Sequence, residues 1–190
     1  DGNSYRPSIS ADGRFVAFAS DATSLVPGDS NEVTDIFVCD RQLSVFQRVS
    51  VADSGDEAND HNYWPVLSSD GLYVAYQSYA DNLIPGDPNN EPDIHGYDLQ
   101  TGKVQRISVA FDGQQANDYS SAPSISSDGR YIAYQSQATN LVPGDAGWTD
   151  VFVMDREAYT VRRVSVMSDG TPVSAGSYYA AISPEGGYVA

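Results

Sequence analysis

The sequence predicts an all-β protein made of repeated blades of four antiparallel strands, as in a β-propeller. The first observation is an internal repeat with a period of about 58 residues, marked by a turn at Asp12, Asp70, Asp128 and Glu185 that is followed by glycine. The second is that every period contains four short stretches rich in aromatic and β-branched residues, and no useful length of helical periodicity. A sandwich would not repeat one unit in this way, so propeller blades are the better interpretation.

The first period shows how the four strands are predicted. Residues 7–10 form a short first strand, the Asp12-Gly13 turn is a hairpin signal, and residues 15–20 form an aromatic-rich second strand. A loop with a Pro-Gly-Asp element leads to a third strand at 35–40, and a tight turn leads to a fourth at 47–51. The corresponding strands of the other periods are 65–68, 73–78, 93–98 and 105–109, then 123–126, 131–136, 150–155 and 162–166.

The repeat motif resembles a known family. It reads Ser-x-Asp-Gly-Arg-aromatic-Val/Ile-Ala-aromatic, then Asp-Ile/Val-x-x-x-Asp, a turn and Arg-Val-Ser. This resembles the TolB-like (WD-repeat-like) β-propeller repeat of bacteria over essentially the whole chain, with Leu72 and Ile107 as departures in the second copy. The resemblance implies that the first strand of each repeat is the inner strand of a blade and the fourth the outer one. It implies little about function, since such propellers serve as binding platforms, as substrate gates on peptidases and as parts of envelope and secreted proteins.

On this mapping the chain contains three whole blades and part of a fourth. The predicted blades are 1–58, 59–116 and 117–173, and 174–190 would supply the first two strands of an incomplete fourth blade. A closed propeller typically needs about four to eight blades, and a half-blade would leave an unpaired apolar edge. We therefore expect more blades in this protein, two or more chains in one ring, or an open array that polymerises into a filament.

Composition and charge restrict the partners. A net charge of -16 with only ten Lys and Arg residues disfavours nucleic acid and anionic membranes. No apolar run is long enough to span a bilayer, so we expect no membrane insertion. The single cysteine, Cys39, excludes an internal disulfide and is expected to be a buried, unreactive thiol. The chain begins and ends inside the repeat pattern and is interpreted as a segment of a bacterial protein that is extracellular, periplasmic or at the cell surface.

The best candidate site is an oxygen-rich spacing in the Pro-Gly-Asp loop. Asp29, Asn31 and Asp35 stand at positions i, i+2 and i+6, which resembles the front of a calcium loop. The spacing recurs in the other copies as Asp87, Asn89 and Asp93, and in part as Asp145 and Asp150. The later Gly and Glu of a full calcium loop are missing. Bound calcium is one interpretation, and a turn closed by local hydrogen bonds to the carboxylates is the other.

Two further residue types recur in every repeat and are therefore interpreted as structural rather than catalytic. The aspartates after the third strand are expected to cap the following turn, and the arginines of the fourth strand are expected to pack over a neighbouring blade and pair with an acid. These residues are Asp40, Asp98 and Asp155, and Arg48, Arg106 and Arg163. The acidic connectors at 53–61 and 112–118 are interpreted as solvated loops, with additional cation ligands as the alternative.

Aromatic residues offer a second kind of candidate site. The chain has thirteen tyrosines, together with Trp64 and Trp148 near loops. Exposed aromatic side chains of this kind can bind carbohydrate or protein by stacking, and packing between blades is the alternative. His61 and His95 are too few for a zinc site, and His95 is interpreted as a tolerated substitution for the phenylalanine of the sister copies.

No catalytic motif is found in the sequence. There is no nucleophile elbow, His-Glu-x-x-His pattern or phosphate loop. The first functional hypothesis is therefore a non-enzymatic module for binding or structural assembly, whose partners are other copies of itself or further blades of the same protein. The alternative is the propeller domain of a larger secreted peptidase or polysaccharide-degrading enzyme.

Overall fold

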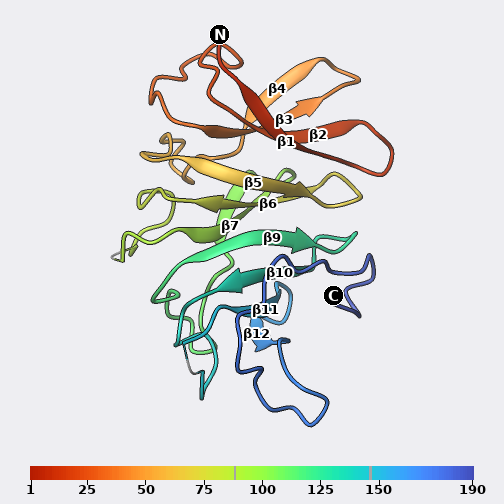
Figure 1. Ribbon diagram of the computed structural model, residues 1–190. Helices are drawn as coiled ribbons and strands as arrows, with labels where there is room; N and C mark the ends of the chain where they lie inside the picture. The colour runs from red at the N-terminus through yellow and green to blue at the C-terminus, as the bar shows by residue number, and fades with distance from the viewer. Residues whose placement is uncertain (88, 146) are drawn as a thin grey trace.

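The computed structural model describes residues 1–87, 89–145 and 147–190. Within them the protein is all-β, with three four-stranded antiparallel sheets that correspond to the predicted blades (Figure 1). The strands are β1 (Ser4–Ile9), β2 (Phe15–Ser20), β3 (Asp35–Asp40), β4 (Val45–Arg48), β5 (Asn62–Leu67), β6 (Tyr73–Ser78), β7 (Asp93–Asp98), β8 (Lys103–Arg106), β9 (Ser120–Ile125), β10 (Tyr131–Ser136), β11 (Asp150–Asp155) and β12 (Thr160–Arg163). No helix in this part of the chain could cross a membrane.

Each blade is a meander in which consecutive strands are neighbours. Blade 1 has the order β1-β2-β3-β4, blade 2 has β5-β6-β7-β8, and blade 3 has β9-β10-β11-β12. The second and third strands pair over their whole length, as from Phe15 opposite Asp40 to Ser20 opposite Asp35 in blade 1. Their predicted bounds are confirmed in all three blades, because an apolar β-branched run between turn residues specifies a strand locally.

The first strand of each blade begins earlier than predicted. In blade 1 the predicted start at residue 7 is wrong, because Pro7 lies at a β-bulge inside the strand. The pairing shifts between Tyr5 and Ser8, and Arg6 adopts a φ of 50°. An extra, unpaired residue removes the need for a ladder hydrogen bond from proline, so the strand continues through it.

The fourth strand of each blade ends earlier than predicted. In blade 1 it stops at Arg48 rather than at residue 51. The chain then turns into the connector, where Val51 forms an isolated bridge with Glu57. Val49 still donates its N–H to the carbonyl of Ile36 in β3 at 2.8 Å, whereas Val51 pairs with the connector.

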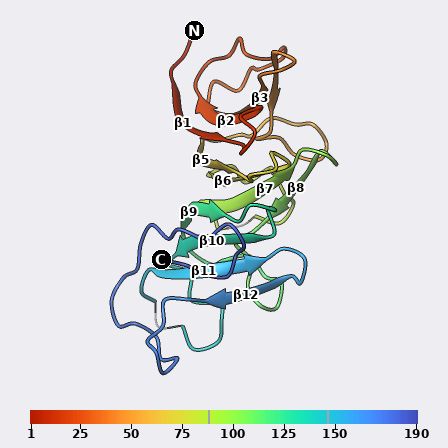
Figure 2. The same cartoon turned by 90° about the vertical axis from the view of Figure 1, so that its right-hand side faces the viewer.

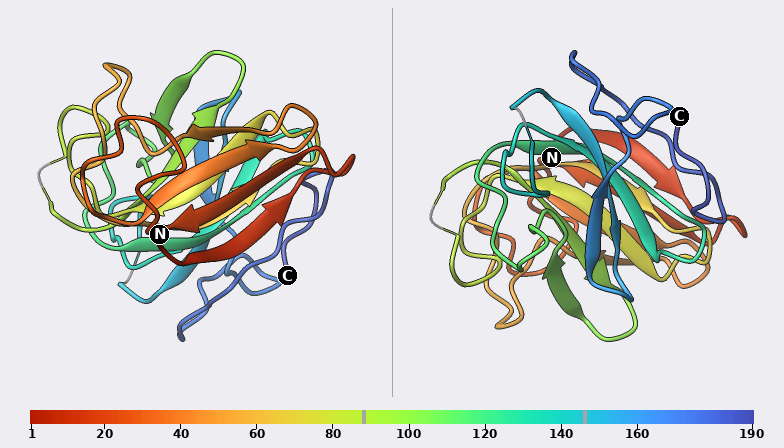
Figure 3. Two further views of the ribbon diagram at one scale, coloured as in Figure 1. Left: turned by 90° about the horizontal axis from the view of Figure 1, so that it is seen from above. Right: turned by 90° about the horizontal axis from the view of Figure 1, so that it is seen from below.

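The blades stack face to face in chain order (Figure 2). Seen along the stack, the strands of successive sheets cross at an angle (Figure 3). We call the face that a blade turns to its predecessor the leading face, and the face turned to its successor the trailing face. Side chains alternate between them, so Val74 and Tyr76 pack toward blade 1 while Tyr73 and Ala75 pack toward blade 3.

The core consists of apolar layers between these faces. In the first layer the small Ala17 and Ala19 of blade 1 pack against the larger Val74 and Tyr76 of blade 2, which fills the space between the sheets. The second layer joins blades 2 and 3 through Tyr73, Ala75, Ile94, Ile107, Ile132, Tyr134, Phe152 and Met154. Both faces of blade 2 are therefore buried.

The first hairpin turn of blade 2 and that of blade 3 each rest on the preceding blade. At Gly129 an added Cβ would lie 2.9 Å from the Cβ of Tyr73, and the φ of 71° also favours glycine. The same contact recurs between Gly186 and Tyr131. The positive φ of the turn and its close packing on the preceding blade thus both require glycine at this position.

Residues 174–190 dock on the trailing face of blade 3. Their pairing is limited to an isolated bridge between Ile182 and Val189, flanked by two hydrogen bonds of 2.9 and 3.0 Å between Ala181 and Ala190. Ala180 packs with Ile182 and Val189 on blade 3. The N–H of Ile182 donates to Ser124 Oγ at 3.1 Å, as Leu67 donates to Ser8 in blade 1. This segment therefore takes the place that β5 and β6 take on blade 1.

His95 in β7 lies fully buried at a position where the sister blades have Phe37 and Phe152. Its ring stacks near Tyr76 with the centroids 6.0 Å apart. Among the described residues neither ring nitrogen has a hydrogen-bond partner. Burial lowers the pKa of His95 to about 3, assisted by the charge of Arg106 and opposed by the backbone of Asp93. The imidazole is thus neutral. Burying its two unpaired nitrogens lowers the stability of the protein, a cost that a phenylalanine side chain would not have.

Replacing His95 with phenylalanine is expected to stabilise the protein by about 1–3 kcal/mol at pH 7, because two unsatisfied buried nitrogens are removed. The parent should also lose stability as the pH falls below about 6.5, where the unfolded histidine gains a proton that the native one rejects until about pH 3. Urea unfolding of both proteins between pH 7.5 and 5 measures this. Equal pH slopes for parent and variant would contradict the expectation.

Candidate functional site

Each blade holds one arginine whose side chain is no more than 10% exposed, between carboxylates from separate segments. In blade 1 Arg48 ends β4, and its Nη1 lies 3.1 Å from Asp29 Oδ1 in the Pro-Gly-Asp loop. The same atom lies 3.4 Å from Asp35 Oδ2 at the start of β3 and 2.5 Å from Glu57 Oε1 in the connector. The guanidinium therefore joins a loop, a strand and the link to the next blade.

Blades 2 and 3 repeat the cluster with fewer acids. Arg106 lies 3.0 Å from Asp87 and 3.2 Å from Asp93, and the amide of Gln115 donates to both carboxylates. The third cluster consists of Arg163 with Asp145 at 3.3 Å and Asp150 at 3.4 Å. Among the described residues, blade 1 alone sets three carboxylates around one arginine.

The strand-starting aspartate is held by a serine just after the fourth strand. Ser50 Oγ donates to Asp35 at 2.5 Å and accepts the N–H of Ile36 at 3.1 Å. Burial nevertheless raises the pKa of Asp35, against hydrogen bonds from Ser50 and Asn31. Burial likewise raises the pKa of Asp93 to about 6, although Ser108 and Arg106 oppose it. These carboxylates are costly to ionise where they lie, so a positive partner is essential.

The structure places an arginine at the position where one of the two interpretations of this spacing put a calcium ion. Asp29 and Asp35 converge as expected, but Asn31 turns its amide nitrogen to Asp35 at 3.0 Å, and its oxygen accepts the N–H of Val33. Within the described residues no group of three or more His, Cys, Asp or Glu side chains is arranged to hold a metal. The guanidinium of Arg48 supplies the charge between the carboxylates. Calcium binding at these residues stays a prediction.

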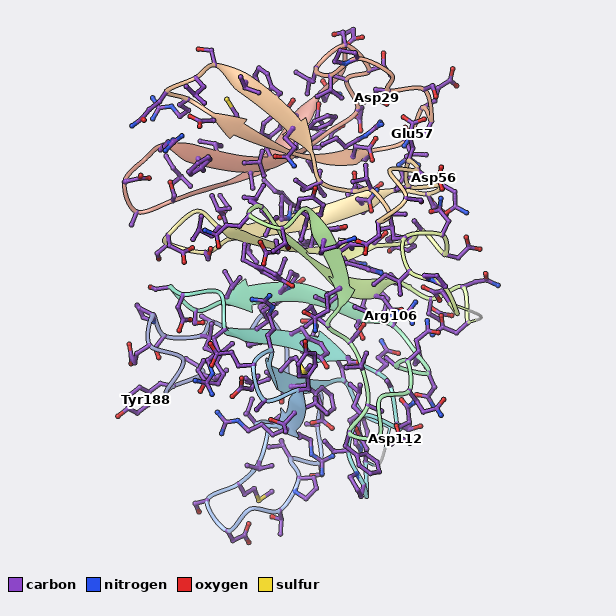
Figure 4. All side chains as sticks on the ribbon, turned by 180° about the vertical axis from the view of Figure 1, so that it is seen from behind. Asp29, Asp56, Glu57, Arg106, Asp112 and Tyr188 are labelled. Atoms are coloured by element: carbon purple, nitrogen blue, oxygen red, sulfur yellow. The ribbon has the colours of Figure 1, made fainter. Side chains whose placement is uncertain are left out.

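Glu57 is the cluster member that sequence reasoning did not single out. It lies within the acidic connector at 53–61, for which additional cation ligands were an alternative. Figure 4 shows Asp29 and Glu57 at the same side of the stack, with Tyr188 at the opposite side. The residues that correspond to Glu57 in the other repeats are Gln115 and Pro172, which carry no charge. Comparison of the three repeats therefore shows that this position adds a negative charge to the cluster of blade 1 and not to those of blades 2 and 3.

The prediction that Asp40 and its counterparts cap a turn is confirmed. Asp40 Oδ1 accepts the N–H groups of Gln42 and Leu43 at 2.9 and 3.2 Å. Its other oxygen pairs with Arg14 at 2.6 Å. The acid that pairs with Arg48 is thus not Asp40, which is used by a different arginine.

The two tryptophans lie in different surroundings. Trp64 is part of β5 and not of a loop, and the guanidinium of Arg6 lies 3.2 Å from its ring centroid. The ring centroid of Tyr179, on the docked C-terminal segment, lies 6.3 Å from that of Trp64. Trp148 lies in the loop before β11 and is 52% exposed. Carbohydrate binding at either residue stays a prediction. The contacts of Trp64 with Arg6 and Tyr179 agree with the alternative interpretation, in which the aromatic residues pack between blades.

Comparisons with known proteins identify the fold. No protein-family model and no curated protein matches the sequence. Among solved structures, TolB from Acinetobacter baumannii matches 100% of this chain with a TM-score of 0.59 at 16% identity. The β-propeller domain of the Trilobed protease from Pyrococcus furiosus matches 85% of it with a TM-score of 0.53 at 15% identity.

The fold is that of a β-propeller. A structure of prolyl endopeptidase is also similar, with a TM-score of 0.52 at 13% identity over 99% of this chain. The chain spans 37% of TolB, 41% of the Trilobed protease propeller and 25% of the prolyl endopeptidase. Its three stacked blades therefore match parts of larger propeller proteins, and these include TolB as well as peptidases.

Changing Arg48 to glutamine removes the positive charge between Asp29, Asp35 and Glu57. We expect the free energy of unfolding to fall by about 3 kcal/mol, because carboxylates are left buried without compensation. Urea unfolding measures the loss, and the exposed Arg162→Gln change is the control.

The same variant tests the calcium prediction. Calcium at millimolar concentration is expected to raise the melting temperature of Arg48→Gln by binding only the native state. The parent protein in the same series shows whether calcium also acts while the guanidinium is present. A variant that does not respond to calcium would contradict cation binding by these carboxylates.

Proposed function

We propose that this chain is a non-enzymatic β-propeller repeat module that works through binding or structural assembly at the ends of its stack. The observation that supports the proposal is the leading face of blade 1. The corresponding faces of blades 2 and 3 form the two main core layers. In blade 1 the same face is apolar, and in the described part of the chain no blade packs on it, so that part of it is exposed.

Single positions show the difference. Ile9 is 57% exposed, whereas Leu67 at the same position of blade 2 is 6% exposed. Phe46 is 39% exposed and packs edge to face on Phe18. Phe18 and Phe46 also line a hollow of about 400 Å³, together with Ser4, Tyr5, Pro7, Val16 and Leu25. A contiguous apolar surface of this kind marks a protein contact.

The repeat indicates what fits this surface. Blades 2 and 3 receive the trailing face of another blade, which presents small residues such as Ala17 and Ala19. The complementary partner is therefore a blade of the same type, from another copy or from further blades of the same protein. A net charge of -16 suits a soluble, outward-facing protein, and we propose an extracellular, periplasmic or cell-surface location in bacteria.

A second candidate function follows from the similarity to peptidase structures. The chain spans 25% of the prolyl endopeptidase that it resembles. In this alternative the module is the propeller of a larger secreted enzyme, and its uncovered faces contact the remaining blades while the chemistry lies elsewhere. A full reading frame that encodes a hydrolase or lyase domain would decide for it.

Assembly through the leading face has a direct test. The parent is expected to self-associate above 20.4 kDa in a concentration series by size-exclusion chromatography with light scattering. The double change Ile9→Asp and Phe46→Asp should yield monomers, because charge replaces the apolar contact. Tyr159→Asp, at an exposed turn of blade 3, is the matched control and should behave as the parent. A parent that stays monomeric and soluble at every concentration would overturn the assembly version.

A further inference from the structure

A groove lies open at the trailing end of the stack, between blade 3 and the docked C-terminal segment. It has a volume of about 370 Å³. Its wall is built by the strands of blade 3 and by the turn near Gly186, and the residues that matter are Tyr131, Val153, Asp155, Thr160, Arg162 and Glu185. The groove is separate from the carboxylate–arginine clusters.

The same groove exists between blades 1 and 2, where it is partly filled. There it measures about 240 Å³ and is lined by Phe15, Val38, Asp40, Val45 and Gln47, the counterparts of the blade 3 residues. Blade 2 closes it with Leu72 and Leu99. The amide of Gln47 donates to the hydroxyl of Tyr97 at 3.1 Å. A side chain of the third strand of the next blade therefore enters this position.

An open strand edge accompanies the empty groove. Residues 188–190 correspond to 73–75 of β6, which pair with 96–98 of β7. In the described part of the chain, the only bridge that residues 188–190 form is the one between Val189 and Ile182, so the edge that would face a third strand has no strand beside it. Such an edge pairs readily with an added strand.

Charge selects the side chain that would enter. Arg162 occupies the position of Gln47 and is exposed, and it forms no ion pair with the described residues. Asp155 is already paired with Arg130 at 2.8 Å. An entering side chain with an acceptor at its tip, as Tyr97 has, would meet the guanidinium of Arg162 while its ring contacts Tyr131 and Val153.

We propose that this groove binds the third strand of a further repeat, which adds to the edge at residues 188–190 as β7 adds to β6. The strand has the pattern Asp-Ile/Val-x-x-Tyr-Asp, and its tyrosine enters the groove beside Arg162. The inference rests on the proposed function, because it names the partner of the trailing end. A second copy is a poor donor, since β3, β7 and β11 are each paired on both sides within their own sheets.

The probe for this groove is a labelled synthetic peptide with the sequence of residues 93–106, which spans β7 and β8. We expect saturable binding to the protein in fluorescence polarisation. Arg162→Glu should weaken binding about tenfold or more, because a carboxylate replaces the donor. Arg41→Glu makes the same charge change at an exposed arginine in the turn after β3 and should bind as the parent. Circular dichroism melting verifies that both variants are folded.

A second peptide separates the tyrosine from general strand addition. The same sequence with alanine in place of Tyr97 is expected to lose most of the affinity, and a scrambled peptide should not bind. Equal binding by the Arg162→Glu and Arg41→Glu variants, or no binding by the parent, would overturn the proposal. The proposal would also be overturned if Arg162→Glu lost self-association in the absence of peptide, because a second copy of the chain would then be the occupant of the groove.

The leading-face variant separates this proposal from the assembly function. Ile9→Asp with Phe46→Asp should abolish self-association and still bind the peptide, because the two ends are distinct surfaces. If the parent assembles but does not bind the peptide, the groove proposal fails and the assembly function stands. If the peptide binds while the parent stays monomeric, self-assembly fails and strand addition at the trailing end stands.

Discussion

Face-to-face burial of apolar strand surfaces is the interaction on which the structure depends. Every sheet of this chain is apolar on both sides, as shown by the alternation of Tyr73, Val74, Ala75 and Tyr76 between two core layers. A single blade of this kind would expose two apolar faces, so it is stable only between neighbours. Stacking, turn glycines and docking of the C-terminal segment all follow from this requirement.

The carboxylate–arginine clusters are a consequence of the same stacking. Packing one blade on the next buries the start of the third strand, and with it Asp35, Asp93 and Asp150. Burial raises the pKa of Asp35 and Asp93, and the arginine of the fourth strand compensates for the charge. The connector to the next blade supplies Glu57 in one case, so the cluster also ties the blades to one another.

The outer faces at the two ends of the stack are less completely buried than the faces between blades. At one end the leading face of blade 1 leaves Ile9 and Phe46 exposed. At the other end residues 174–190 cover the part of blade 3 that the first two strands of a blade would cover, and a groove remains beside them.

The sequence by itself determined the number of blades, the second and third strands and the turn after each third strand. These features depend on neighbouring residues: alternation along a strand, glycine in a hairpin turn, and an aspartate that accepts N–H groups two and three residues ahead. The calcium-like spacing around Asp29 was also visible, and its carboxylates do converge. Local patterns are sufficient where the interacting groups lie within one short segment.

Only the tertiary structure decided which groups meet between segments. The bulge at Arg6 and Pro7 depends on pairing with β2, so the proline suggested a strand start at the wrong place. The arginine between Asp29 and Asp35 comes from β4, and Glu57 reaches it along the path of the connector. A repeat tells which residues are equivalent, but the partners of a charged side chain depend on how the faces of successive blades are brought together.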